Sequence, residues 1–319
     1  MKIVVPDDFP SVFTGTPAEP ALRALGDVTI FTERGANDEA ELLRRVRDAD
    51  AVLSLRAYSR FTAHVLSQCP RLRMISIWGT GTDNVDLSTC RDRKVIVANT
   101  PGVNANAVAE HTIALMLSVA RQIPAMDRGV RDGQWPRAML VQLEGKTLGV
   151  IGLGAIGRRV AMLATAFGMR VVATTWGPDA GRAAAIGASS ASLEQLLGES
   201  DFVSLHLRLS SETNGILNAE RIAMMKPSAF LINTARGSLV NRDALIDALR
   251  ARRIGGAGLD VFHDEPISPD DPLLTLRNVV MTPHNAGTTS EVIDLGLRRA
   301  VENIARLATA EAPRPSSPA

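Results

Sequence analysis

Short apolar runs alternate along the chain with longer segments whose hydrophobic positions follow a helical period. The runs are rich in valine and isoleucine, and they span residues 51–55, 74–77, 95–98, 148–151, 171–174, 202–205 and 230–232. Nearly continuous apolar strands that alternate with helices are typical of parallel sheets covered by helices on both faces. The pattern therefore predicts an α/β protein.

The length of the chain and two turn-rich stretches predict more than one domain. A chain of 319 residues is too long for one ordinary core and fits two domains of roughly 150 residues each. Residues 99–104 and 282–287 are short of regular period and rich in turn-forming residues. We expect the chain to cross between the two domains at these stretches.

Charge and composition exclude several classes of partner. The 35 basic and 34 acidic residues leave a net charge of +1, so the chain lacks the long-range field that would hold a nucleic acid. No apolar run approaches the roughly 18 residues needed to span a bilayer, and the first residues do not form a signal-peptide pattern. The two cysteines, Cys69 and Cys90, have neither metal-ligand nor redox spacing. We therefore expect no membrane contact, no metal site and a cytoplasmic location.

A glycine-rich turn predicts a nucleotide site. Strand-like residues 147–151 precede Gly152-Leu-Gly154-Ala-Ile-Gly157, and residues 158–167 have helical period. A G-x-G-x-x-G turn between a strand and a helix is typical of dinucleotide-binding domains. Gly152 would form the tight turn, Gly154 would admit a pyrophosphate close to the backbone, and Gly157 would allow close helix packing.

The same turn would place the cofactor phosphates at a helix N-terminus. Amide groups in the first turn of a helix are unpaired and lie at its positive end, where they attract phosphates. Ala155 and Ile156 belong to this predicted cofactor site. His206 ends a strand beside the presumed nucleotide site and is a further candidate for a cofactor contact.

The choice between NAD and NADP stays open at this point. The residue that reads the adenosine ribose should follow the strand 170–174, and it is Thr175 instead of an acid. An acid there would accept a hydrogen bond from the ribose 2′-hydroxyl and repel a 2′-phosphate. Arg158 and Arg182 are candidates for pairing with a 2′-phosphate.

Three side chains near strand ends suit the reduction of a 2-oxo acid. His284 follows the strand 279–281, and loops at strand ends form the sites of open α/β sheets. Histidine is the side chain best matched to proton donation at neutral pH. Arg236 would bind the substrate carboxylate with two parallel hydrogen bonds, and Glu265 would orient the ring of His284 and stabilise its charged form.

The chain resembles the D-isomer-specific 2-hydroxyacid dehydrogenase family over residues 51–307. Seven segments carry the resemblance in the right order. They are Gly79-Thr-Gly-Thr-Asp-Asn-Val-Asp, Asn99-Thr-Pro-Gly with Val108-Ala-Glu-His, the glycine turn, Asn233-Thr-Ala-Arg-Gly, Gly258-Leu-Asp-Val-Phe, Asp264-Glu-Pro and Pro283-His-Asn-Ala-Gly.

The resemblance implies a set of catalytic and cofactor contacts. Arg236, Glu265 and His284 would be the catalytic set, with His284 as general acid in reduction and general base in oxidation. Asp260 would meet the nicotinamide amide, and Thr234 would line the nicotinamide pocket.

The resemblance also implies a substrate site and a domain plan. Backbone amides near Gly79 and Thr80 would hold the substrate carboxylate. The fold would consist of two Rossmann-like, doubly wound parallel-sheet domains, with a discontinuous substrate domain (residues 1–99 and 285–319) and a dinucleotide-binding domain (residues 100–284). A helix over residues 107–121 would link the domains at the interface of a homodimer.

One position, occupied by Ile77, bears on whether the substrate is phosphorylated. Family members that use 3-phosphoglycerate often carry two arginines for its phosphate; Arg56 matches one, whereas Ile77 stands in place of the other. Because each charge-assisted contact is worth roughly 1.5 to 3 kcal/mol, we expect an unphosphorylated 2-oxo acid such as glyoxylate, hydroxypyruvate or pyruvate. A 3-phosphoglycerate-type dehydrogenase is the alternative if Arg137 reaches across a dimer.

Two further alternatives lie outside this reaction. Some relatives oxidise formate, but those enzymes commonly have glutamine where this chain has Glu265. Other relatives bind NADH as sensors and recruit partners without catalysis. An intact set of Arg236, Glu265 and His284 is compatible with the sensor alternative as well as with the enzyme.

Overall fold

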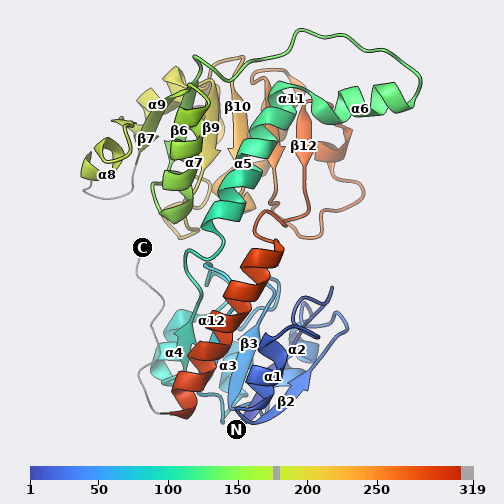
Figure 1. Cartoon of the computed structure of the whole chain (residues 1–319), viewed down its shortest axis with the longest axis vertical. Helices are drawn as coiled ribbons and strands as arrows, with labels where there is room; N and C mark the ends of the chain where they lie inside the picture. Colours follow the sequence, from blue (N-terminus) through green and yellow to red (C-terminus); the bar gives the residue numbers. More distant parts are fainter. Residues whose placement is uncertain (175–179, 310–319) are drawn as a thin grey trace. The chain divides into compact units, whose positions relative to one another are not determined.

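The computed structural model describes residues 1–174 and 180–309 and divides the chain into two compact units (Figure 1). The first unit comprises Met1–Asn104 with Thr288–Ala319, and the second comprises Ala105–Gly287. The chain passes between the units at the ends of the turn-rich stretches 99–104 and 282–287. The assignment of the first unit to the substrate and of the second to the dinucleotide stays a prediction.

A five-stranded parallel sheet forms the centre of the first unit. Its strands lie in the order β2-β1-β3-β4-β5, which is a doubly wound order that reverses beside β1. The strands are β1 (Lys2–Val5), β2 (Asp27–Ile30), β3 (Ala51–Ser54), β4 (Met74–Ile77) and β5 (Ile96–Ala98). The helices are α1 (Ala18–Arg23), α2 (Glu39–Val46), α3 (Ala63–Ser67), α4 (Leu87–Asp92) and α12 (Ser290–Ala308).

A seven-stranded parallel sheet forms the centre of the second unit. Its order is β12-β11-β10-β9-β6-β7-β8, so the chain starts in the middle at β6 and winds outward in both directions, as in a dinucleotide-binding domain. The strands are β6 (Thr147–Ile151), β7 (Arg170–Thr174), β8 (Ser189–Ser190), β9 (Phe202–Leu205), β10 (Phe230–Asn233), β11 (Gly256–Leu259) and β12 (Val279–Met281).

Helices surround this second sheet. They are α5 (Ala105–Ala120), α6 (Ile123–Arg131), α7 (Ala155–Ala166), α8 (Ala180–Ala184), α9 (Leu193–Glu199), α10 (Ala219–Ala223) and α11 (Arg242–Arg250), with short 3₁₀ helices at Gly237–Leu239 and Pro272–Thr275. The predicted α/β class with doubly wound parallel sheets is therefore confirmed in both units.

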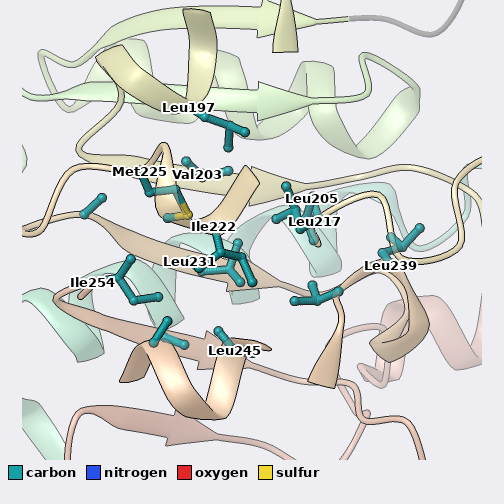
Figure 2. Close-up of a cluster of buried hydrophobic side chains, with 14 of the residues drawn as sticks. Leu197, Val203, Leu205, Leu217, Ile222, Met225, Leu231, Leu239, Leu245 and Ile254 are labelled. Atoms are coloured by element: carbon teal, nitrogen blue, oxygen red, sulfur yellow. The ribbon is translucent and has the colours of Figure 1, made fainter. Parts of the chain in front are cut away.

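Apolar side chains cover both faces of each sheet because successive strand residues point to opposite faces. On β9, Phe202 packs with α5 and α7 on one face, whereas Val203 and Leu205 pack with α9, α10 and α11 on the other. Figure 2 shows the second of these clusters, in which Val203, Leu205 and Leu231 of the strands lie with the helix residues Leu197, Ile222 and Leu245. The buried strands therefore hold their carboxyl ends, and the loops that follow them, at one rigid edge of the sheet.

The last helix belongs to the first unit although it lies at the other end of the sequence (Figure 1). Thr289 caps α12 by accepting a hydrogen bond from the backbone N–H of Val292. Leu297 and Ile304 of this helix are fully buried against Ile3 and Leu53 of the sheet. Among the described residues, no helix is long and apolar enough to cross a membrane.

Candidate active site

The turn between β6 and α7 has the tight geometry that its glycines predict. Gly152 adopts a left-handed backbone with φ of +99°, and its N–H donates to Thr174 O at 2.9 Å. A Cβ atom on Gly157 would lie 1.9 Å from the carbonyl oxygen of Gly152. At Gly154, in contrast, a Cβ would meet nothing within 4 Å. The first and last glycines are therefore required by the fold, whereas the middle one faces open space.

The N-terminus of α7 is suited to an anion. No side chain among the described residues caps this helix at Gly154, so the amides of Ala155 and Ile156 in its first turn are left for another acceptor. The partial positive charge at this end of the helix favours a phosphate. The predicted pyrophosphate position thus fits the open space beside Gly154.

Not all residues of the predicted adenosine site can be placed. Thr175 lies outside the described residues, and so does the side chain of Arg182. Arg158 is exposed in the first turn of α7. The choice between NAD and NADP therefore stays open.

His206 follows β9 directly and borders the glycine turn. Its N–H donates to Ile151 O at 2.8 Å, and its Nε2 lies 2.8 Å from the hydroxyl of Ser204. Burial lowers the pKa of His206 to about 3, so the imidazole is neutral at pH 7. A cofactor contact of His206 would therefore be a neutral hydrogen bond or a packing contact, and it stays a prediction.

Arg236 is carried by a loop that Asn233 holds in shape. Asn233 is buried at the end of β10; its side chain donates to Arg236 O at 2.8 Å and accepts from the N–H of Ala235 at 3.0 Å. The guanidinium of Arg236 donates to Ala235 O at 2.8 Å. Sequence reasoning missed this role of Asn233, although its place at the end of a strand, directly before the loop, could have indicated it.

His284 and Glu265 form a hydrogen-bonded pair. The distance between His284 Nδ1 and Glu265 Oε2 is 2.6 Å, and about a third of each side chain is exposed (34% and 33%). The backbone N–H of Phe262 donates to the other carboxylate oxygen, Oε1, at 3.0 Å. The predicted contact between the two side chains is therefore present.

The protonation of Glu265 follows from its neighbours. Burial by itself would raise the pKa of Glu265. The hydrogen bond and charge of His284 oppose this, and the N–H of Phe262 and the charge of Arg236 add to the opposition, so that the pKa of Glu265 lies below its ordinary value. The carboxylate is ionised at neutral pH and only accepts hydrogen bonds. Nδ1 of His284 is therefore the donor, and Nε2 is the nitrogen left to exchange a proton with a substrate.

Comparisons with known proteins agree with this geometry. Residues 113–286 match the model of the D-isomer specific 2-hydroxyacid dehydrogenase, NAD binding domain. The glyoxylate reductase of Aeropyrum pernix is 40% identical over 296 residues, which cover 90% of this chain and 88% of that enzyme. The chain belongs to the D-isomer specific 2-hydroxyacid dehydrogenase family.

Two further members of the family are similar over nearly the whole chain. The D-3-phosphoglycerate dehydrogenase of Mycobacterium tuberculosis is 40% identical over 295 residues, which cover 92% of this chain but 55% of that enzyme. The structure of D-lactate dehydrogenase from Aquifex aeolicus, complexed with NAD and lactic acid, superposes with a TM-score of 0.85 at 31% identity and covers 98% of this chain and 96% of that one. As a member of this family, the chain is an NAD(P)-dependent oxidoreductase.

Two residues that the family resemblance assigns to the nicotinamide lie in the second unit. Thr234 is buried at the end of β10, and its hydroxyl lies 3.0 Å from that of Thr112. Thr112 already donates to Val108 O, so Thr234 is the donor between the two hydroxyls. Asp260 is fully buried and accepts three hydrogen bonds from the loop around His284. A carboxylate has about four acceptor positions, which leaves room for the predicted nicotinamide contact.

The residues predicted to bind the substrate belong to the first unit. Arg56 donates through Nη2 to Pro10 O. The N–H of Gly79 donates to the hydroxyl of Thr100 at 2.9 Å, so this amide is not available for the substrate carboxylate while that bond exists. The carbonyl of Thr80 accepts from the side-chain amide of Asn99 at 2.7 Å. The role of the backbone amides near Gly79 and Thr80 in holding the substrate carboxylate stays a prediction. No metal-binding cluster exists among the described residues.

Proposed function

We propose that this enzyme transfers a hydride reversibly between a nicotinamide cofactor and a small, unphosphorylated 2-hydroxy or 2-oxo acid such as glyoxylate, hydroxypyruvate or pyruvate. The pair formed by Glu265 and His284 at 2.6 Å is the observation that carries this proposal. It fixes one histidine nitrogen as donor to the carboxylate and leaves the other for general acid-base catalysis. When bound, the reduced nicotinamide supplies the hydride.

The chain's own residues would then complete the reduction. His284 would donate the proton from Nε2 to the carbonyl oxygen of the substrate, and Glu265 would stabilise the imidazolium that exists before the transfer. Arg236 would bind the substrate carboxylate through its planar guanidinium. In the direction of oxidation, His284 would accept the hydroxyl proton. The proposed cofactor contacts of Gly154, Ala155 and Ile156 rest on the uncapped N-terminus of α7.

A substrate panel tests the proposal. Oxidation of NADH and of NADPH should be measured side by side with glyoxylate, hydroxypyruvate, pyruvate, phenylpyruvate and 3-phosphohydroxypyruvate. We expect turnover of an unphosphorylated 2-oxo acid, and the cofactor comparison decides between NAD and NADP. A far higher kcat/KM for 3-phosphohydroxypyruvate would favour the phosphoglycerate-type alternative. Tight NADH binding without turnover of any member would favour the NADH-sensing binding protein.

Ile77 argues against the phosphoglycerate-type alternative. Its side chain is 5% exposed and packs in the apolar core beside Ile75 and Val97. It therefore offers neither charge nor hydrogen bonds where phosphate-binding relatives place an arginine. The similarity to the phosphoglycerate dehydrogenase of M. tuberculosis nevertheless keeps 3-phosphohydroxypyruvate in the panel.

Arg236→Lys should impair substrate use more than cofactor binding. A lysine keeps the charge but cannot form two parallel hydrogen bonds to a carboxylate. We expect kcat/KM for the 2-oxo acid to fall by about ten- to 100-fold, since one charge-assisted hydrogen bond is worth about 1.5–3 kcal/mol. Steady-state kinetics checks this, with Arg250→Lys as the matched control because Arg250 is an exposed arginine of α11. An unchanged KM and kcat would place the carboxylate site elsewhere.

We also propose a homodimer that uses the segment from α6 onward. Figure 1 shows α6 and the segment after it extending from the second unit. Five large apolar side chains in this segment are exposed, namely Ile123, Val130, Trp135, Met139 and Leu140, with Trp135 at 77% and Met139 at 96%. Apolar groups of this size concentrated on one short segment are typical of an interface, and a second copy offers the same apolar surface.

Sedimentation equilibrium checks the dimer. The unmodified protein should have twice the monomer mass, and Trp135→Glu with Met139→Glu should shift it toward the monomer. The doubly substituted chain should remain folded, because both side chains are exposed within one chain. Met224→Glu, at a side chain that is 44% exposed elsewhere in the second unit, is the control. A monomeric unmodified protein, or a substituted protein with unchanged dimer mass, would contradict the proposal.

The two cysteines are free and buried, which agrees with the cytoplasmic location expected from the sequence.

A further inference from the structure

We infer that Asp260, Thr282 and His111 form a positioning network that holds the loop of His284 in its catalytic conformation. The inference rests on the proposed role of His284. None of the three residues is proposed to touch the substrate through this network. They act through the backbone on either side of His284, and they connect that loop to the long helix α5.

Asp260 holds the backbone that follows His284. Its side chain is fully buried at the end of β11. Oδ1 accepts from the N–H of Asn285 at 3.1 Å, and Oδ2 accepts from the N–H of Ala286 at 3.0 Å. A buried carboxylate is tolerated only when its oxygens are hydrogen-bonded. The two amides directly after His284 therefore meet a rigid acceptor that is itself anchored in the sheet.

Thr282 holds the backbone that precedes His284. The N–H of Thr282 donates to Leu259 O at 2.9 Å, and its carbonyl accepts from the N–H of His284 at 3.0 Å. Its hydroxyl donates to Asp260 Oδ1 at 2.6 Å. Residues on both sides of His284 are thus fixed to the same buried carboxylate or to the neighbouring strand.

The backbone of His284 itself needs such support. Its φ is +53°, in the left-handed region that residues other than glycine rarely adopt. Such a conformation is energetically unfavourable and persists only where the surrounding contacts hold it in place. The hydrogen bonds of Asp260 and Thr282 supply that restraint. They direct the side chain of His284 toward Glu265.

His111 extends the network to α5. The direction of its hydrogen bond to Thr282 follows from which atoms carry a proton. Nε2 of His111 lies 2.9 Å from the hydroxyl of Thr282 and 3.6 Å from Asp260 Oδ1. The hydroxyl of Thr282 has a single proton, and it donates that proton to Asp260 Oδ1. Nε2 of His111 must therefore carry a proton and donate to Thr282. This contact gives His111, on the apolar helix α5, a specific hydrogen-bond partner.

The substitutions Thr282→Val and Thr282→Ser test the network. Valine has the shape of threonine without the hydroxyl, so Asp260 loses one donor and His111 loses its acceptor. A displacement of about 1 Å of a catalytic group can cost about 100-fold in rate. We expect kcat to fall by about ten- to 100-fold in Thr282→Val, with the KM for NADH unchanged. Thr282→Ser restores the hydroxyl and should return kcat to near the unmodified value.

A double-substitution cycle with His284→Ala separates positioning from general stability. If Thr282 acts through His284, then Thr282→Val should cost nothing further in the His284→Ala background, because the two losses are not additive. A merely structural role would give additive losses. His111→Gln, which keeps a donor, should retain more activity than His111→Leu, and His64→Leu at an exposed histidine of α3 is the matched control. Melting temperatures identify any variant that fails to fold.

The outcomes are distinct from those of the proposed function. A kcat for Thr282→Val and His111→Leu within twofold of the unmodified enzyme, or additive losses with His284→Ala, would overturn the network alone. An unmodified enzyme whose turnover is insensitive to His284→Ala would overturn the proposed mechanism instead.

Discussion

The substitution His284→Ala is expected to lower kcat for 2-oxo acid reduction by about 10² to 10⁴, the usual contribution of general acid-base catalysis. Alanine cannot supply the proton that the carbonyl oxygen needs as the hydride arrives. The affinity for NADH should stay near that of the unmodified enzyme, because the proposed phosphate contacts lie at the turn between β6 and α7. Stopped-flow reduction and fluorescence titration with NADH measure the two quantities separately.

The fold should survive this change. The side chain of His284 is 34% exposed, so its removal leaves neither a closed cavity nor a deeply buried unpaired group. His64→Ala, at an exposed histidine of α3, is the control for the loss of an imidazole. An unchanged kcat in His284→Ala would remove this residue from the mechanism. A loss of NADH affinity as large as the loss of kcat would show that it acts on the cofactor instead.

Gly157→Ala should disrupt both the second unit and its cofactor site. The added Cβ would lie 1.9 Å from the carbonyl oxygen of Gly152, which is backbone and cannot rotate away. Helix α7 would have to move off β6, and overpacking of this kind typically costs about 1–3 kcal/mol or more. For a unit of this size, 3 kcal/mol corresponds to a fall in melting temperature of about 6–12 °C. Calorimetry and NADH titration check the two effects.

Two other glycines provide matched controls for this prediction. At Gly154 and at Gly198 in α9, a Cβ would meet nothing within 4 Å. Gly198→Ala should leave stability equal or higher, because alanine favours a helix by about 1 kcal/mol over glycine. Gly154→Ala should keep the melting temperature but weaken NADH binding, since its methyl group would occupy the space proposed for the pyrophosphate. A Gly157→Ala protein with unchanged melting temperature and NADH affinity would contradict the packing argument.

One strand shows where the hydrophobic pattern stops being informative. Strand β11 (Gly256–Leu259) is fully buried, yet it contains two glycines and does not stand out among the apolar runs. The reason is the packing of α5, because a Cβ on Gly258 would come within 3.1 Å of Leu115 and of Ile232. Where a helix packs closely against a strand, glycine takes the place of the larger apolar side chains by which a strand is recognised in the sequence.

The candidate site divides in the same way. The strand-end positions of Arg236 and His284 follow from short local patterns, and so does the predicted partner of His284. Asn233 has only its place at a strand end as a signal, and Thr282 has none, because each acts through the backbone of a neighbouring loop. The sequence pattern also does not predict that the N–H of Gly79 donates to Thr100, since Thr100 lies on the loop after another strand.

The sequence by itself determined the α/β class and the glycine turn, because each depends on neighbours within a few positions along the chain. Tertiary structure alone decided which distant residues meet. His111 reaches Thr282 across 171 positions in sequence, and this contact exists only because α5 packs over the strands β10, β11 and β12. Such pairings depend on the order of strands in the sheet, and no local pattern of hydrophobic and polar residues encodes that order.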